Sequence, residues 1–455
     1  MHLFRKNQSE DRYTRMTETP VPKLILELSV PTILSMLVTG IYNTADTFFV
    51  GRISTQATAA VGLVFSVMAI IQAFGFLCGH GSGNYLSRML GAGKQAEADE
   101  MAATGFAISL LIGLLLAVLG FIFMDPIVQF LGRGATAETL VETKRYMRII
   151  LIGAPFMTGQ FVINNQLRFQ GSAVYAMVGI LTGAILNIFL DPLFILVFGL
   201  GVSGAALATI TGQIISFIVL LIGSTKGENI RLHVRNIRLN GHYLYEMING
   251  GIPSLFRQGL ASVSTILLNT SAGIFGGDAA IAGMSIVTRI LMLTISVVIG
   301  FGQGYQPVCS FNYGAGRLAR VREGFFFCVK YATIFLSVCA AACLIFAPGI
   351  IAVFRDDPDV IAVGSAALRY QAAVLPLMGT FTMSNMMLQS IGKGLKASIA
   401  SSSRNGIFFI PLILILPRLF GLTGVEITQA VADILSFLLA IPLARSELRK
   451  MKAPQ

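Results

Sequence analysis

The stretch from 169 to 225 contains a single charged side chain, Asp191. Three further stretches, 53–87, 331–354 and 370–392, contain no Asp, Glu, Lys or Arg. About 20 consecutive apolar residues suffice for one helix that spans a bilayer, so runs of this length must supply several spans. A chain that is 55% apolar and 12% charged also has too little polar surface to cover a soluble particle of 455 residues. We therefore expect a membrane protein built from helices.

Charged or glycine-rich breaks divide these runs into twelve segments of spanning length. The sequence thus predicts an all-α membrane protein with twelve transmembrane helices in two six-helix, pseudo-symmetric lobes. The predicted helices cover residues 24–50, 54–82, 100–123, 141–165, 172–198, 202–224, 243–275, 280–310, 325–347, 361–387, 395–417 and 422–443.

The distribution of basic residues predicts the orientation. If the amino terminus is cytoplasmic, 23 of the 33 Lys and Arg residues fall in inner loops and tails, and only eight fall outside. Since basic residues are retained on the cytoplasmic side, both termini are expected there. The same distribution explains the net charge of +11 without a nucleic-acid partner, because no basic stretch interleaved with aromatic residues is present.

The sequence lacks the residue arrangements that are typical of metal sites and of catalytic sites. The five cysteines lie in or near apolar segments and have no spacing typical of metal ligands, so they are expected to be small core residues. No Ser/His arrangement or cluster of His, Asp and Glu suggests catalysis. We therefore expect no enzyme activity, no cofactor and no metal, apart from a sodium ion at the site described below.

The second half of the chain repeats landmarks of the first half in the same order and at a nearly constant offset. The pairs are Pro31 and Pro253, Gly91 and Gly314, Arg148 and Arg369, Pro155 and Pro376, Gly171 and Gly392, Pro192 and Pro411, and Gly204 and Gly424. Each copy holds six predicted helices, an even number, so both copies enter the membrane with the same topology. The predicted parts are a cytoplasmic tail (1–23), an N-lobe (24–224), a cytoplasmic linker (225–242), a C-lobe (243–447) and a C-terminal tail (448–455).

Two lobes of this kind can rock about a central cavity and open it to alternate sides of the membrane, as many secondary transporters do. The alternative is that the duplication only makes a stable bundle. Pro31 and Pro253 lie in the first helix of each lobe, where proline bends a helix, so they are predicted to be hinges or plain kinks.

The repeat breaks at two carboxylates. Asp46 and Asp191 lie within apolar segments of the first copy, whereas the second copy has Asn269 and Ile410 at these positions. A charged Asp at the centre of a bilayer costs roughly 2.5 to 3.5 kcal/mol on insertion scales, so one that is retained usually faces a cavity or a partner. We therefore expect the ion site in the N-lobe, and no acidic site in the second copy.

Three polar residues accompany the acids. Tyr42 precedes Asp46 and Asn187 precedes Asp191 by four residues, which places each pair on one helix face. Thr209, in the next predicted helix, returns to a comparable depth. These five side chains are predicted to form an oxygen-rich pocket that holds protons or a sodium ion. Alternatively, Asp46 is an interfacial residue beside Arg52, and Asp191 with Pro192 marks only a kink.

Five motifs together resemble the multidrug and toxic compound extrusion (MATE) family, in its bacterial branch of DinF-like and MepA-like proteins. They are IYNTADTFFVGRIS (41–54), LSRMLGAGK (86–94), NIFLDPLFI (187–195), GVSGAALAT (201–209) and QPVCSFNYGAGR (306–317). The resemblance covers residues 24 to 447. It implies a monomeric, multi-pass protein of the bacterial inner membrane that exports cationic, amphipathic drugs in exchange for inward H⁺ or Na⁺. Asp46, Asn187, Asp191 and Thr209 match the acids and polar residues of the family's first lobe, with Tyr42 beside them.

Other branches of that family place a cation site in the second lobe, on a Glu and an Asp. This chain offers Gln258, Gln371 and Asn385 there instead, so no second acidic site is implied. Together with Asn269, Met284 and Met292, these residues are predicted to line an adaptable substrate cavity. The alternative function is a flippase for lipid-linked precursors or oligosaccharides, which would need several basic residues in the cavity.

Overall fold

The computed structural model describes residues 12–133 and 135–451, and this part of the chain is helical without β-strands. The outer ends of the predicted tails, 1–11 and 452–455, lie outside the described residues. In chain order the helices are α2 (Val21–Gly51), α3 (Thr55–Gly91), α4 (Gln95–Ile122), α5 (Met124–Leu131), α6 (Ala137–Phe169), α7 (Ala173–Pro192), α8 (Gly201–Ser224), α9 (Gly241–Gly314), α10 (Leu318–Phe354), α11 (Pro358–Val374), α12 (Leu377–Ser390), α13 (Gly394–Ser402), α14 (Phe409–Phe420) and α15 (Leu422–Lys450).

The predicted all-α membrane architecture is confirmed. Ten helical stretches of the described chain are long and apolar enough to cross a membrane, and α11 and α12, bent by 58° to one another, pass the same test when the pair is counted as one span. The 74-residue α9 is broken at Gly277, where φ is 63°. A Cβ at Gly273 would lie 3.1 Å from Ile281, so the chain turns back there, and α9 supplies two of the twelve spans.

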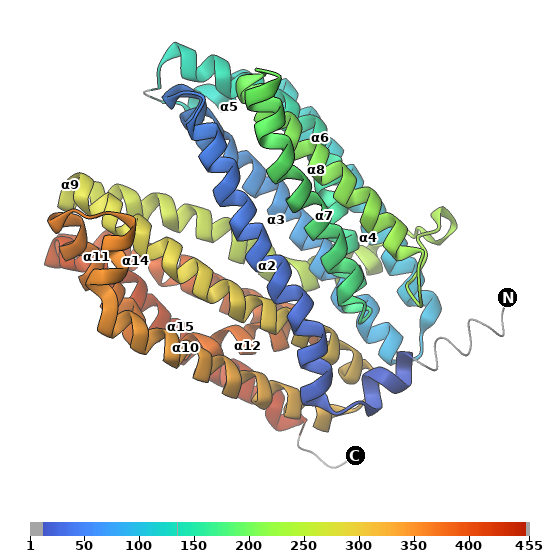
Figure 1. Cartoon of the computed structure of the whole chain (residues 1–455). Helices are drawn as coiled ribbons and strands as arrows, with labels where there is room; N and C mark the ends of the chain where they lie inside the picture. Colours follow the sequence, from blue (N-terminus) through green and yellow to red (C-terminus); the bar gives the residue numbers. More distant parts are fainter. Residues whose placement is uncertain (1–11, 134, 452–455) are drawn as a thin grey trace. The chain divides into compact units, whose positions relative to one another are not determined.

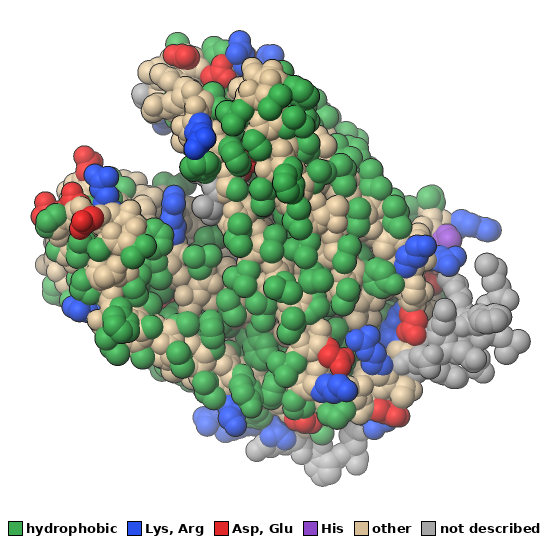
Figure 2. Space-filling model, viewed as in Figure 1, with side chains coloured by type: hydrophobic (Ala, Val, Ile, Leu, Met, Phe, Trp, Pro, Cys, Tyr) green, Lys and Arg blue, Asp and Glu red, His purple; other side chains and the backbone are tan. Residues whose placement is uncertain are grey.

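The flanks of the helices are apolar, and the charges gather at their ends. Figure 2 shows hydrophobic side chains over the length of the helices and Lys, Arg, Asp and Glu mainly near the helix ends. Large apolar side chains such as Phe189, Ile274 and Val338 are exposed along these flanks. Exposed apolar surface of this extent is expected where lipid replaces water.

The chain forms two compact units. Of the described residues, unit 1 comprises 12–18, 34–133 and 135–251, and unit 2 comprises 19–33 and 252–451. Within unit 1, α6 packs against α3, α4, α7 and α8, and within unit 2, α15 packs against α11, α12 and α14. Figure 1 allows each bundle to be followed by its labels.

Two helices contribute their leading arms to the unit formed by the other half of the chain. The leading arm of α2, residues 21–33, belongs to unit 2, and the leading arm of α9, residues 241–251, belongs to unit 1. The units therefore differ from the predicted lobes 24–224 and 243–447 at these arms. The lobes are predicted from the order of repeated residues along the chain. The compact units instead reflect which helices pack against one another, so the two divisions differ where a helix arm packs on the other half of the chain.

Small residues let each arm approach its unit closely. In unit 1, a Cβ at Gly81 of α3 would overlap the backbone carbonyl of Met247. In unit 2, a Cβ at Gly304 would overlap Ser29, whose hydroxyl donates a hydrogen bond to the carbonyl of Phe301 at 3.1 Å. Gly81 and Gly304 occupy equivalent positions of the two copies, at the offset of the glycine motif. Both copies therefore use the same close approach between helices.

Candidate functional site

The predicted site residues lie on three helices of unit 1. Tyr42 and Asp46 are on α2, Asn187 and Asp191 are on α7, and Thr209 is on α8. The backbones of α7 and α8 nearly touch, because a Cβ at Gly183 would lie 2.7 Å from the carbonyl oxygen of Gly212. Asn187 and Thr209 each lie one turn from this crossing, so the crossing holds their side chains close together.

The two carboxylates lie close enough to interact electrostatically. Tyr42 lies within electrostatic range of both Asp46 and Asp191. Asp191 is fully buried, Asn187 is 2% exposed and Thr209 is 3% exposed, whereas Asp46 is half-buried. Arg52 does not form an ion pair with Asp46 among the described residues; its guanidinium lies over the ring of Phe48, 4.5 Å from the centroid. The interfacial interpretation of Asp46 therefore has no ion pair to support it.

Six buried polar atoms of these residues have no hydrogen-bond partner in the described part of the chain. They are Oδ1 of Asp46, both side-chain polar atoms of Asn187, both carboxylate oxygens of Asp191 and the hydroxyl oxygen of Thr209. Buried polar groups in native proteins are nearly always satisfied, and an unpaired buried carboxylate is especially costly. Four unsatisfied side chains in one place are therefore typical of a binding site for a proton, cation or water.

Tyr146 of α6 belongs to the same group, although it is not among the residues predicted from the sequence. This tyrosine is 1% exposed and lies within electrostatic range of Tyr42, Asp46 and Asp191. The Thr209 hydroxyl lies close to the hydroxyl of this tyrosine. A comparison of the two copies could have indicated this residue. At the offset that relates Arg148 to Arg369, the second copy has Ala367 in place of Tyr146.

An apolar cluster borders the site. Tyr146 packs in a buried core with Val50, Ile150, Ala206 and Ile210. Such surroundings keep water away and strengthen the attraction between the carboxylates and any bound cation. The group offers carboxylate, hydroxyl and amide oxygens, which suit a proton or a hard cation such as Na⁺. The described residues contain no group of three or more His, Cys, Asp or Glu side chains that could hold a metal ion.

The other predicted residues lie apart from this group. Pro31 and Pro253 are buried within α2 and α9, and the assignment to units changes within three residues of each. Of the predicted cavity residues, Met284, Gln371 and Asn385 are buried, Gln258 and Asn269 are half-buried, and Met292 is 66% exposed. Asn385 donates hydrogen bonds to the carbonyl of Ala397 and to Ser401, both at 2.8 Å, so it joins α12 to α13.

No acidic site is predicted in the second copy, but two acids are buried in one of its helices. Glu426 and Asp433 lie on α15 and are 6% and 3% exposed. Asp433 accepts hydrogen bonds from Arg404 at 2.8 and 3.3 Å and from Gln429 at 2.7 Å. Arg404 and Asp433 therefore form a two-point ion pair within unit 2, and the charge of this acid is neutralised by the protein itself.

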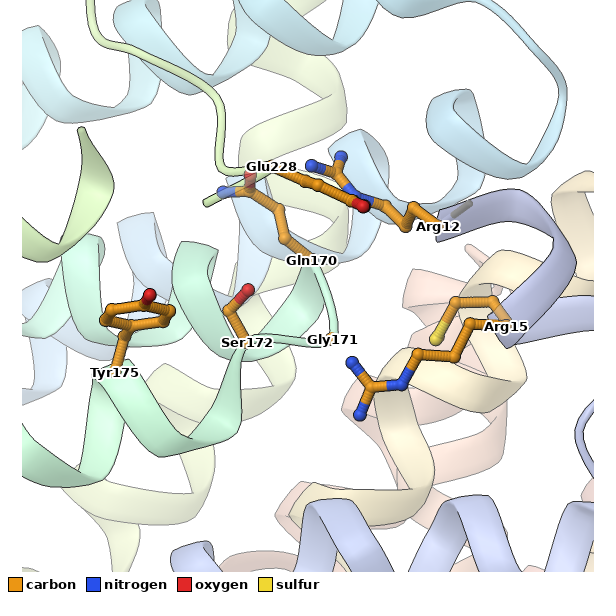
Figure 3. A pocket seen from close by; sticks show the side chains of 8 residues that line it. Arg12, Arg15, Gln170, Gly171, Ser172, Tyr175 and Glu228 are labelled. Carbon is orange, nitrogen blue, oxygen red and sulfur yellow. The ribbon is translucent and has the colours of Figure 1, made fainter. Parts of the chain in front are cut away.

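A cavity of about 270 Å³ lies elsewhere in unit 1, beside the turn at Gly171 and Ser172 that joins α6 to α7 (Figure 3). Arg12 and Glu228 line it and form an ion pair at 3.6 Å. Burial lowers the pKa of the Arg12 guanidinium, and the negative charge of Glu228 opposes this shift. Along α6 this end lies about 36 Å from Tyr146, so the cavity is separate from the carboxylate group.

Comparison with known proteins gives consistent matches along the chain. A family model described as MatE matches residues 31–193 and again residues 253–415, which confirms the internal repeat. The multidrug export protein MepA of Staphylococcus haemolyticus is 28% identical over 426 residues, which cover 93% of each chain. MepA of Staphylococcus aureus strain MSSA476 is also 28% identical over the same length.

Solved structures share the whole fold. An outward-facing multidrug resistance MATE family transporter of the MOP superfamily matches with a TM-score of 0.90 and 26% identity, over 97% of this chain and 99% of that one. A MOP superfamily transporter from Pyrococcus furiosus matches with a TM-score of 0.89 and 27% identity over the same shares. The description of that protein says that the reverse polarity of its binding pocket suggests a different function.

Because Arg404 and Asp433 form a buried ion pair, we expect loss of the arginine alone to lower thermal stability much more than replacement of both residues. Arg404→Gln leaves Asp433 buried without its cation, which typically costs about 3 to 5 kcal/mol. We expect the thermal unfolding midpoint of the detergent-solubilised protein to fall by several degrees. The double variant Arg404→Met, Asp433→Leu should recover most of this loss, because an apolar pair of similar size can replace a buried ion pair.

Lys144→Gln serves as the control, since it breaks an ion pair between Lys144 and the exposed Asp125. It should barely change the midpoint. Equal shifts for Arg404→Gln and Lys144→Gln would contradict a structural role for the Arg404–Asp433 pair.

Proposed function

Because the chain belongs to the MatE family, whose model matches both of its halves, we propose that it is a secondary active multidrug efflux transporter. Relatives that align over 93% of its length carry the name multidrug export protein. The proposed exchange is export of cationic, amphipathic compounds against inward flow of H⁺ or Na⁺. Transport is the function of the family, and no enzyme activity is proposed.

One observation supports the proposal that transport is coupled to an ion. Asp46, Asn187, Asp191 and Thr209 leave six buried polar atoms without a partner in the described part of unit 1. Two neighbouring carboxylates in apolar surroundings are stabilised by a proton or a cation, and they are destabilised when it leaves. Loading and release at this group can therefore bias the transporter between two states, as ligand-dependent conformational change requires.

We further propose a transport mechanism for the chain, its orientation in the membrane and its oligomeric state. Rocking of its two halves would open a cavity to alternate sides of the membrane. Pro31 and Pro253 are placed to bend α2 and α9 near the residues where the assignment to units changes. The distribution of Lys and Arg favours cytoplasmic termini in a bacterial inner membrane, and the protein is proposed to act as a monomer.

A flippase for lipid-linked precursors is less well supported. Binding a pyrophosphate would need several cations in the membrane interior. Arg404 is neutralised by Asp433 and Arg289 is exposed on its helix, so of these three helix arginines of unit 2 Arg257 alone could serve such a group, and one cation is not several. The acids of unit 1 favour positively charged substrates instead.

The direct test uses purified protein in liposomes loaded with ethidium. An inward proton gradient or an inward sodium gradient is imposed separately, and release of the dye is followed by fluorescence. We expect one of the two gradients to accelerate export at least several-fold over liposomes without a gradient. Export that is the same under both gradients and without any gradient would show that ethidium movement is not coupled.

The asymmetry of the two copies predicts the outcome of substitutions. Asp191→Asn should abolish drug resistance in cells at normal expression, because an amide cannot take up and release the coupling proton or balance a sodium charge. Asp46→Ala should cause a similar loss, whereas Asn269→Ala, its counterpart in the second copy, should be much milder. Resistance and membrane expression of the three variants are compared side by side. Retained resistance in Asp191→Asn would remove this residue from the coupling site.

A further inference from the structure

Arg257 places a positive charge in the middle of a long apolar helix. It lies between the start of α9 at Gly241 and the break at Gly277. At about 1.5 Å per residue it is about 24 Å from one end of this helical segment and about 30 Å from the other, far from either end. A charged residue at such a depth is costly and is usually retained for a function.

No carboxylate compensates this charge among the described residues. Arg257 Nη1 donates to Oδ1 of Asn385 at 3.3 Å, and Nη2 donates to the hydroxyl of Ser254 at 3.2 Å. Both partners are neutral, and no acidic neighbour acts on the guanidinium electrostatically. In the same unit, Arg404 has a two-point contact with Asp433. Unit 2 therefore neutralises Arg404 with Asp433 and leaves Arg257 without an acidic partner among the described residues.

The guanidinium is held in a fixed position. Ser254 also accepts a hydrogen bond from Gln389 at 2.8 Å, and the amide of Asn385 donates to Ala397 and Ser401, both at 2.8 Å. These bonds tie Arg257 to α12 and α13. A donor that is already positioned loses little entropy when it binds a ligand, so its contribution to affinity is larger than that of a mobile surface arginine.

The same side chain keeps free donors and is accessible. An arginine has five N–H groups, and the contacts to Asn385 and Ser254 use one on each terminal nitrogen. The Nε–H and one N–H on each Nη therefore remain. The residue is half-buried, so part of its side chain remains at the surface of the chain. Planar oxyanions, carboxylates above all, match this fork of donors.

We propose that Arg257 is an anion-recognition site for a carboxylate carried by part of the exported compounds. The substrate class then includes zwitterionic amphiphiles as well as cations. This inference rests on the proposed export function, but it concerns a different unit and a different charge from the coupling site. A purely cationic substrate would gain nothing from this arginine.

A matched pair of dyes tests the inference. Rhodamine 123 is the methyl ester of rhodamine 110, so the two dyes differ in whether they present a free carboxylate. Export of each from liposomes is measured for the wild-type chain and for Arg257→Gln. The variant should export rhodamine 110 about tenfold more slowly or worse, since it loses charge-assisted hydrogen bonds, while rhodamine 123 stays within twofold.

Two further variants complete the design. Arg289→Gln is the control, because it removes an exposed arginine of the same long helix and should change neither dye. Arg257→Lys keeps the charge but not the fork, so we expect an intermediate loss for rhodamine 110 alone. This variant decides the question if Arg257→Gln does not yield folded protein.

The outcomes separate this inference from the export function. Wild-type export of rhodamine 123 without rhodamine 110, or equal effects of Arg257→Gln on both dyes, overturns the anion site and leaves multidrug export standing. Failure of the wild-type chain to export either dye under any imposed gradient overturns the export function itself.

Discussion

Two carboxylates cannot lie side by side in apolar surroundings without a proton, a cation or water, and the mechanism proposed for this chain depends on that constraint. Asp46 and Asp191 interact across α2 and α7, and both oxygens of Asp191 lack a partner among the described residues. The close crossing of α7 and α8 at Gly183 and Gly212 brings Asn187 and Thr209 to the same place. Burial of these groups costs stability, which natural proteins accept mainly at functional sites. The bound ion that removes this cost is the coupling ion in our proposal.

The two copies of the repeat treat charge differently. The first copy leaves negative charge without a partner in its described core, whereas the second copy neutralises Asp433 with Arg404 and leaves Arg257 positive. In our proposal, a frame duplicated in sequence thus carries two sites of opposite polarity. One is suited to a coupling cation, and the other is suited to an anionic group of a substrate. This division would let a single fold couple ion flow to the export of chemically varied compounds.

Much of this organisation could be predicted from the sequence. Charge-free runs predict the spans, and the repeat predicts the topology. The four-residue spacing places Asp46 and Asp191 with their neighbours, because helix geometry is regular. Tyr146 and Asp433 are not predicted because a single polar residue in a helix has no spacing signal of its own, although Ala367 and Gln213 at the equivalent positions mark both as breaks in the repeat. The leading arms of α2 and α9 could not be assigned, since packing between distant segments leaves no periodic signal in either one.

The most direct measurement is cation release when a substrate binds to the isolated protein. Ethidium is added to detergent-solubilised protein in weakly buffered solution, and released protons and sodium ions are both recorded. We expect binding to release one of these ions from the wild-type chain, whereas Asp191→Asn should release neither while it still folds. Equal release from the wild-type chain and from Asp191→Asn would contradict a coupling site at the carboxylates of unit 1.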